Sequence, residues 1–318
     1  MTAVLKKSIL LVAFVLIAAA AAPAAGRKPV VIAPSVRVGG VVVGGLTSEP
    51  ARARLDRAFT NAIPIRFGKD SLAVSPAHFG TSAAVNAAVS AALQERAGGK
   101  VAVRVRLEPQ SVDAYVVWLA RRYRRAPVNA RVSGVDPALR PVIAPDKPGV
   151  VVRQAAMRHA IVRALQTGSR KPLKLIVKAI PPKLTRAHFG PVIVISRGGN
   201  ALRLFNGRRF VQSFGVATGR AQYPTPSGIF AVVDMQRDPW WRPPHSDWAK
   251  GLKPIPPGPG NPLGTRWMGL SAPGVGIHGT PDDSSIGYSA SHGCIRMHIP
   301  DAAWLFEHVH MGTPVVIV

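Results

Sequence analysis

The residues best suited to chemistry lie near the C-terminus, in the segment Ser291-His292-Gly293-Cys294-Ile295-Arg296-Met297. Cys294 is the only cysteine of the chain, and a second histidine, His278, precedes His292 by 14 residues. A free thiol is mostly protonated at neutral pH, so an imidazole that takes its proton creates an ion pair and a strong nucleophile. The pattern predicts covalent catalysis with Cys294 as the nucleophile.

Gly293 directly precedes the candidate nucleophile. Because glycine has no side chain, the backbone can turn sharply there, and a substrate carbonyl can come close to the N–H groups of Gly293 and Cys294. Such donors would stabilise the oxyanion of a tetrahedral intermediate. The predicted reaction is therefore acyl transfer.

A zinc site is the main alternative for this region, because it offers four potential ligands: His278, His292, Cys294 and His298. These residues lack the paired C-x-x-C or H-E-x-x-H spacing that is typical of zinc sites. The sequence therefore predicts neither a metal nor a cofactor.

The first 25 residues have the layout of a secretory signal. Lys6 and Lys7 precede an apolar run over residues 9–17, and an A-x-A cleavage pattern ends at Ala24. An uncleaved membrane anchor is the alternative, since the apolar stretch 8–25 spans 18 residues, near the lower limit for a bilayer helix. In both cases we expect the remainder of the chain to be exported.

A lone cysteine in an exported protein suggests a functional thiol, with a buried apolar role or an intermolecular bridge as the alternatives.

The net charge is +26, or +24 without Lys6 and Lys7. Residues 26–185 carry 19 of these surplus positive charges, and residues 186–318 carry 5. In a cytoplasmic protein this excess would indicate nucleic-acid binding, which conflicts with the export signal. Outside the cytoplasm, a basic surface attracts anionic polymers by the same screened electrostatics.

The elements that must position the candidate residues belong to the C-terminal region. Short strands are predicted over residues 192–196, 201–205, 210–217 and 228–235. A helix is expected to begin at Pro300 and to stop before Gly312, and a closing strand follows over 315–318. This pattern predicts a β-rich domain with a late helix.

Residues 30–185 contain an imperfect repeat of about 70 residues. Each unit combines helices with short strands and closes with an alternating strand, over 101–107 in the first and 173–177 in the second. Thr47 is the predicted N-cap of the first helix, over 50–59. We expect two small α+β modules, at 30–110 and 111–185, which bind a ligand or act as a spacer. An inert stalk is the alternative.

The region 190–318 resembles the L,D-transpeptidase (YkuD-like) catalytic domain, whose signature is a His-Gly pair followed by Ser/Thr-His-Gly-Cys and an Arg. Further matching segments are 215–219, Pro224-Thr225-Pro226-Ser227-Gly228, Asn261-Pro262-Leu263-Gly264 before Trp267-Met268, and Gly312-Thr313-Pro314-Val315. The preceding repeats are similar to the peptidoglycan-binding modules often fused to that domain. The resemblance implies a mainly β catalytic domain, an L,D-transpeptidase-type β-sandwich with short helices, preceded by repeated small α+β modules.

The resemblance also implies roles for the motif residues. Cys294 would accept the acyl group, His278 would be its general base, and the backbone carbonyl of Gly279 would orient His278 in place of a carboxylate. His292 would shape the pocket beside the nucleophile, within the same motif as Ser291. Arg296 would brace the catalytic loop or meet a substrate carboxylate, and a structural salt bridge is an equal alternative.

The stretch 234–267 is rich in Trp, Pro and Gly and has little periodicity. A loop of this length is typical of a lid or a binding loop, so Trp241 and Trp267 are predicted to contact substrate, as is Tyr288. A packed surface loop whose tryptophans cover the core is the alternative.

The substrate implied by the resemblance is the stem peptide of peptidoglycan. The enzyme would release the terminal D-Ala of a tetrapeptide stem and form 3-3 cross-links, with glycan and anionic wall polymers as further partners. An L,D-carboxypeptidase that uses water and a non-catalytic wall-binding protein are the alternatives. The expected location is the cell wall, the periplasm or the extracellular face.

Overall fold

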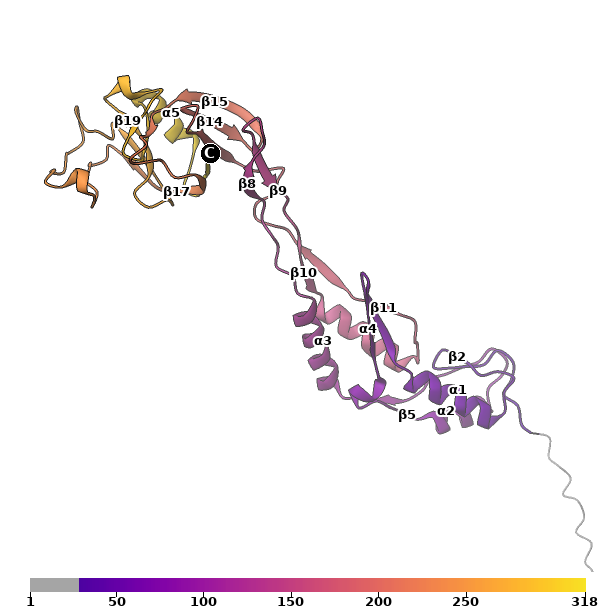
Figure 1. Ribbon diagram of the computed structural model, residues 1–318. Helices are drawn as coiled ribbons and strands as arrows, with labels where there is room; N and C mark the ends of the chain where they lie inside the picture. The colour runs from indigo at the N-terminus through magenta and orange to yellow at the C-terminus, as the bar shows by residue number, and fades with distance from the viewer. Residues whose placement is uncertain (1–28) are drawn as a thin grey trace, which may run out of the picture. The chain divides into compact units, whose positions relative to one another are not determined.

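The computed structural model describes residues 29–318, so the predicted signal segment 1–25 lies outside the described residues (Figure 1). None of the helices between residues 29 and 318 has the length and apolar character needed to cross a bilayer. Contacts between residues divide the chain into two units, Met1–Asp113 with Arg158–Lys174, and Ala114–Met157 with Leu175–Val318. The two repeated modules remain a prediction.

In the first unit, two helices pack with short strands around one apolar core. Helix α1 (Ser48–Thr60) buries Ala51, Leu55 and Phe59, which recur every four residues and so share one helix face. The other elements are α2 (Val85–Ala92), β1 (Arg37–Val38), β2 (Val41–Val42), β3 (Ile63–Phe67), β4 (Asp70–Val74), η1 (Pro76–Phe79), β5 (Ser82–Ala83), β6 (Lys100–Val101), β7 (Val105–Arg106) and β11 (Leu173–Lys174).

Thr47 stands at the N-cap of α1, as predicted, although its side chain makes no capping hydrogen bond. Two local expectations for this region are corrected. The strand expected over 101–107 is two strands, β6 and β7, which pair with different partners. The strand expected over 173–177 is likewise divided, because β11 pairs with β3 whereas β12 (Val177–Ile180) pairs with β10 (Gly149–Val152). Alternating apolar residues do not reveal where a strand changes partners.

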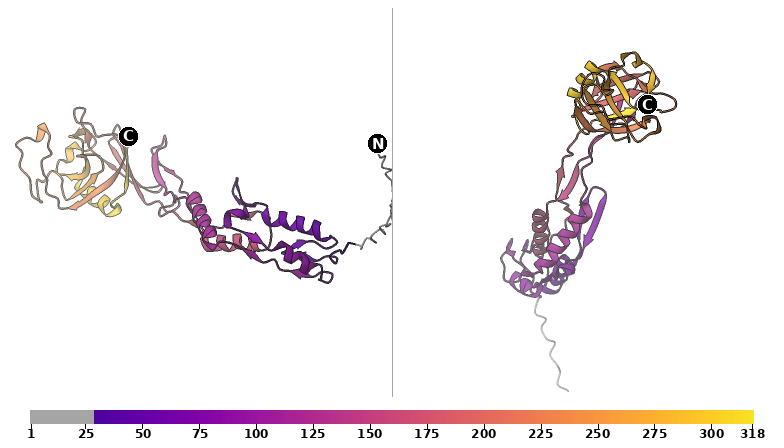
Figure 2. Two further views of the ribbon diagram at one scale, coloured as in Figure 1. Left: turned by 90° about the horizontal axis from the view of Figure 1, so that it is seen from below. Right: turned by 90° about the vertical axis from the view of Figure 1, so that its left-hand side faces the viewer.

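The second unit is built on an eight-stranded mixed sheet, in the order β15-β14-β13-β22-β17-β18-β19-β21. The mainly β fold predicted for the catalytic domain is confirmed, and its strands and helix can be followed from two further sides in Figure 2. The strands are β13 (Pro191–Ser196), β14 (Ala201–Asn206), β15 (Arg209–Gly215), β17 (Gly228–Arg237), β18 (Arg266–Leu270), β19 (Gly276–Thr280), β21 (Ile295–His298) and β22 (Pro314–Ile317).

Both ends of this sheet contribute to a single core. Ile193 and Leu202 from one end join Ile277 and Met297 from the other in one cluster of buried side chains. A separate cluster packs the hairpin of β8 (Arg131–Val135) and β9 (Pro141–Ala144) against β13 and β14. The remaining helices are α3 (Pro109–Tyr123) and α4 (Gln154–Gln166), each of which has residues in both units.

Helix α5 (Ile299–His308) covers the part of the sheet that carries the candidate residues. It has Pro300 in its first turn, as expected, and it contacts β18, β19 and β21. Its buried residues Ala302, Leu305 and Phe306 follow a spacing of three and four, which places them on one face. The helix therefore packs its apolar face against the strands that carry the candidate residues.

The packing of α5 leads to a stability prediction. Leu305 is fully buried, so Leu305→Ala should lower the free energy of unfolding by about 2–5 kcal/mol through lost burial and an unfilled cavity. The exposed variant Glu307→Ala, which loses only an ion pair with Arg237, should cost about 0–1 kcal/mol. All six tryptophans lie in the second unit, so urea denaturation followed by tryptophan fluorescence reports on it. Equal midpoints for the two variants would contradict this packing.

Candidate active site

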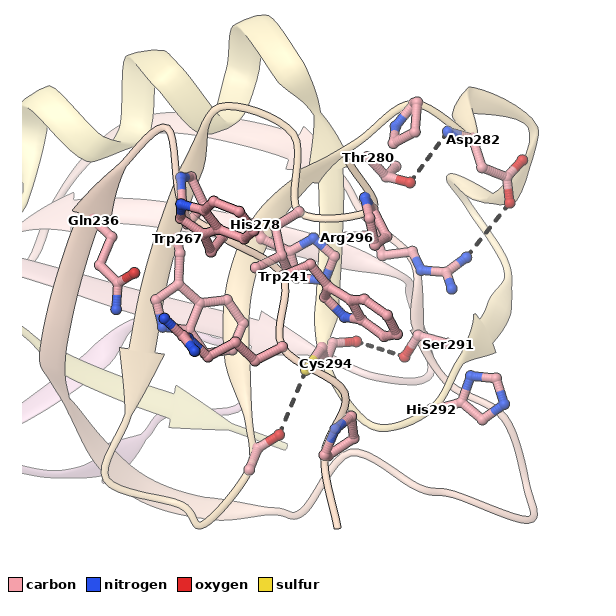
Figure 3. A pocket seen from close by; sticks show the side chains of 18 of the residues that line it. Gln236, Trp241, Trp267, His278, Thr280, Asp282, Ser291, His292, Cys294 and Arg296 are labelled. Atoms are coloured by element: carbon pink, nitrogen blue, oxygen red, sulfur yellow. Dashed lines mark hydrogen bonds and ion pairs between the residues drawn. The ribbon is translucent and has the colours of Figure 1, made fainter. Parts of the chain in front are cut away.

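Two neighbouring parallel strands bring the candidate nucleophile and base together. His278 lies in β19 opposite Arg296 of β21, and Cys294 immediately precedes β21. Both side chains line one cavity of about 1070 Å³, together with Ser291, His292 and Arg296 (Figure 3). The motifs that the sequence separates by 14 residues therefore meet at one site.

His278 is buried, with 5% of its surface exposed. Its Nδ1 lies 2.6 Å from the carbonyl oxygen of Gly279, a geometry in which Nδ1–H donates and the imidazole is held by a backbone carbonyl. Burial lowers the pKa of His278 to about 4, assisted by the charge of Arg296 and opposed by the carbonyls of Gly279 and Pro262. The imidazole is therefore neutral at physiological pH and leaves Nε2 as the basic atom.

The Cys294 thiol donates to the carbonyl of Gly274, with 3.6 Å between sulfur and oxygen. Burial raises the pKa of Cys294, whereas a hydrogen bond from the Gly276 backbone and the charge of Arg296 lower it less strongly. Both pKa directions favour the neutral thiol and the neutral imidazole. The ion pair that forms when the imidazole takes the thiol proton is therefore disfavoured at rest, because burial disfavours both charges.

Ser291 braces the loop that carries the nucleophile. Its hydroxyl donates to the carbonyl of Cys294 at 2.5 Å and accepts from the Gly293 N–H at 3.1 Å. The Gly293 N–H, predicted as an oxyanion donor, is therefore already engaged by Ser291. Gly293 has φ +112°, which only glycine adopts readily, so its place in the loop is confirmed as a turn.

The Arg296 side chain lines the cavity and also contacts Asp282 in an adjacent turn. Its Nη1 lies 3.4 Å from a carboxylate oxygen of Asp282, just before the short helix η3 (Asp283–Ser285). The same guanidinium lines the cavity. The structural salt bridge that was the alternative for Arg296 is thus present, and its role toward the catalytic loop or a substrate stays a prediction.

His292 sits in an aromatic and basic cluster that the sequence did not predict. Its Nε2 lies 2.7 Å from Arg220 Nη2, so Arg220 donates and the imidazole is neutral. The Trp248 ring, from η2 (Asp247–Ala249), stacks on His292 with 4.2 Å between centroids and 21° between planes. Burial, then Arg220 and Arg296, lower the pKa of His292. The loop 238–265 is therefore attached to the nucleophile motif through Trp248.

Of the three predicted substrate-binding aromatics, Trp241 and Trp267 line the cavity. Trp267 donates from Nε1 to Asp234 at 3.0 Å, and its ring covers Gly276, where a Cβ would collide with it. Tyr288 does not line the cavity. Its side chain is 67% exposed, and its backbone carbonyl, just before β20 (Ser289–Ser291), accepts a hydrogen bond from the Thr218 N–H.

Between residues 29 and 318, no group of three or more His, Cys, Asp or Glu side chains is arranged to hold a metal ion. The four residues of the zinc alternative have other contacts: His278 with Gly279, His292 with Arg220, Cys294 with Gly274, and His298 with Asp283 at 2.7 Å.

The protonation states give a prediction that needs no substrate. The rate at which iodoacetamide alkylates Cys294 should rise with pH along one titration whose midpoint lies above the ordinary thiol pKa of about 8.5, because burial stabilises the neutral thiol. Mass spectrometry of the intact protein measures the rate, and no other cysteine interferes. A rate plateau between pH 5 and 7 would instead reveal a thiolate-imidazolium pair and contradict this assignment.

Comparison with known proteins gives the site its family. The L,D-transpeptidase catalytic domain (YkuD) pattern matches residues 190–317. YqjB of Bacillus subtilis, which is named as an L,D-transpeptidase, is 33% identical over 132 residues, which cover 40% of this chain and 70% of YqjB. YkuD of the same organism is 31% identical over 154 residues, or 48% of this chain and 80% of YkuD. The structure of L,D-transpeptidase 3 from Mycobacterium tuberculosis aligns with 61% of this chain and 98% of its own, at 18% identity and a TM-score of 0.36. The chain belongs to the L,D-transpeptidase (YkuD) family.

Proposed function

We propose that this protein is an exported cysteine L,D-transpeptidase that remodels peptidoglycan. The observation that carries the proposal is that His278 in β19 and Cys294, just before the neighbouring strand β21, line one cavity of about 1070 Å³. A cavity of that size accommodates a peptide stem rather than a single small metabolite. Its aromatic walls suit an extended substrate, since Trp241 and Trp267 offer flat apolar contact area.

In the first half-reaction, Cys294 Sγ attacks the carbonyl of the third residue of a tetrapeptide stem. His278 Nε2 takes the thiol proton as the carbon–sulfur bond forms, because the resting thiol is neutral. The tetrahedral intermediate collapses with transfer of that proton to the amine of the terminal D-Ala. D-Ala leaves, and the tripeptide remains as a thioester.

In the second half-reaction, a side-chain amine of another stem attacks the thioester. His278 takes a proton from the attacking nitrogen, and the thiolate leaves and is reprotonated. The products are a 3-3 cross-linked dimer and free enzyme. Water in place of the amine would give a trimmed tripeptide, the L,D-carboxypeptidase alternative.

The location and partners rest on charge and on the leader segment. The basic surplus of residues 26–185 would attract anionic wall polymers, and the preceding modules would bind glycan. Lys6, Lys7 and the apolar run after them supply the export signal.

The decisive experiment incubates the purified protein with disaccharide-tetrapeptide and analyses the muropeptides and the intact protein by mass spectrometry. We expect loss of D-Ala, a tripeptide adduct on the protein, and 3-3 cross-linked dimers. Cys294→Ala should abolish all three products because the nucleophile is gone. Arg209→Ala, an exposed change outside the cavity, serves as the control. Equal turnover by Cys294→Ala would contradict the mechanism, and tripeptide without dimers would favour the carboxypeptidase.

The pKa of His278 predicts the acid limit of the reaction. Since the base must be neutral, kcat should stay constant down to about pH 5 and fall as the pH drops through about 4, where His278 becomes protonated. Circular dichroism at each pH separates this loss from unfolding. An acid limb near pH 6.5, the ordinary value for histidine, would mean that His278 is not desolvated during turnover.

A further inference from the structure

A buried threonine outside the catalytic motifs holds the backbone next to the nucleophile. Thr225 is 1% exposed and lies in the irregular segment Pro224-Thr225-Pro226. Its hydroxyl donates to the Gly293 carbonyl at 2.9 Å and accepts from the Gly219 N–H at 2.8 Å. One side chain therefore joins this segment, the strand β16 (Thr218–Gly219) and the loop of Cys294.

The segment that carries Thr225 has restricted conformational freedom. Proline on both sides restricts the backbone of Thr225, because Pro226 disfavours helical angles at the preceding residue. The guanidinium of Arg197 donates to the Thr225 carbonyl at 2.9 Å. Gly219 packs so closely that a Cβ there would collide with the backbone of Tyr223 and Thr225. The hydroxyl is thus placed before any substrate binds.

The contact with Gly293 orients the peptide group that joins Gly293 to Cys294. In a planar trans peptide the C=O and the N–H point in opposite directions. Because the carbonyl side is anchored on buried Thr225, the Cys294 N–H is directed the other way. Within residues 29–318 the Gly293 N–H is engaged by Ser291, whereas the Cys294 N–H has no protein acceptor.

We propose that Thr225 is a positioning residue for oxyanion stabilisation: by holding the Gly293 carbonyl, it aims the Cys294 N–H at the oxyanion that forms when the thiol attacks. This inference rests on the proposed acyl transfer. A preorganised donor of this kind is worth far more in a water-excluded site than a donor that must reorient during reaction.

Three variants of the full chain test this assignment. Thr225→Val keeps the shape of the side chain but removes the hydroxyl, and Thr225→Ser keeps the hydroxyl. The matched control is Thr313→Val. Thr313 is also fully buried, it does not line the cavity, and its hydroxyl accepts a hydrogen bond from the His310 N–H that the valine variant would lose. Each variant is assayed for D-Ala release from disaccharide-tetrapeptide, for alkylation of Cys294 by iodoacetamide, and for thermal unfolding.

Thr225→Val should lower kcat by about 10- to 100-fold with little change in KM, because the lost interaction acts mainly in the transition state. Alkylation should continue at the wild-type rate, since it uses the same thiol but forms no oxyanion. Thr225→Ser should recover most of the activity, and Thr313→Val should resemble the wild type in kcat despite a similar drop in melting temperature.

The outcomes separate the two proposals. If the wild type releases no D-Ala, the proposed function fails. If the wild type is active and Thr225→Val matches it in kcat, only the role of Thr225 is overturned. A parallel loss of alkylation and acyl transfer would show a collapsed loop and would also overturn the oxyanion role.

Discussion

The parallel pairing of β19 with β21 is the constraint on which the catalytic site depends. It sets His278 opposite Arg296 and so brings the start of β21, with Cys294 before it, next to the base. Parallel neighbours require a crossover connection of a dozen or more residues. The 14 residues 281–294 supply it, and they also contain the turn bound by Arg296 and the loop braced by Ser291. The connection that the topology demands is therefore also the catalytic loop.

Burial between the strands determines the chemistry available to this pair. The same loss of hydration lowers the pKa of His278 and raises that of Cys294, so neither group is charged at rest. A carboxylate beside His278 would favour the imidazolium, whereas the carbonyl of Gly279 orients the ring without adding a full charge. In the proposed reaction, such a pair would act as a general base and a thiol whose proton moves during attack.

The loop is held by hydroxyl groups that are satisfied on both sides. Ser291 and Thr225 each donate one hydrogen bond and accept another, so burying them leaves no unpaired polar atom. Aromatic side chains surround these hydrogen-bonded residues. Trp267 donates a hydrogen bond to Asp234, and Trp248 of the long loop stacks on His292. This arrangement suits the proposed reaction, in which the site holds a peptide and then admits a second substrate.

The sequence by itself determined the residue types of the site and part of the fold around it. The thiol, the His-Gly pair, the strands β13, β14, β15, β17 and β22, and α5 follow from local signals, because side-chain alternation, prolines and glycines act over a few residues. The strands β18, β19 and β21, which lie at the site, were not predicted. The family followed from the same motifs. The two repeated modules stay predictions.

Only the tertiary structure decided which polar groups have hydrogen-bond partners, which side chains are exposed and which strands pair. The Gly293 N–H is taken by Ser291, Tyr288 faces solvent, and the strand over 173–177 divides between two sheets. Thr225 and Arg220 reach the catalytic loop from 68 and 72 residues away. Hydrogen-bond partners at such separations, and the burial that shifts a pKa, arise from packing between distant segments, and no local pattern encodes them.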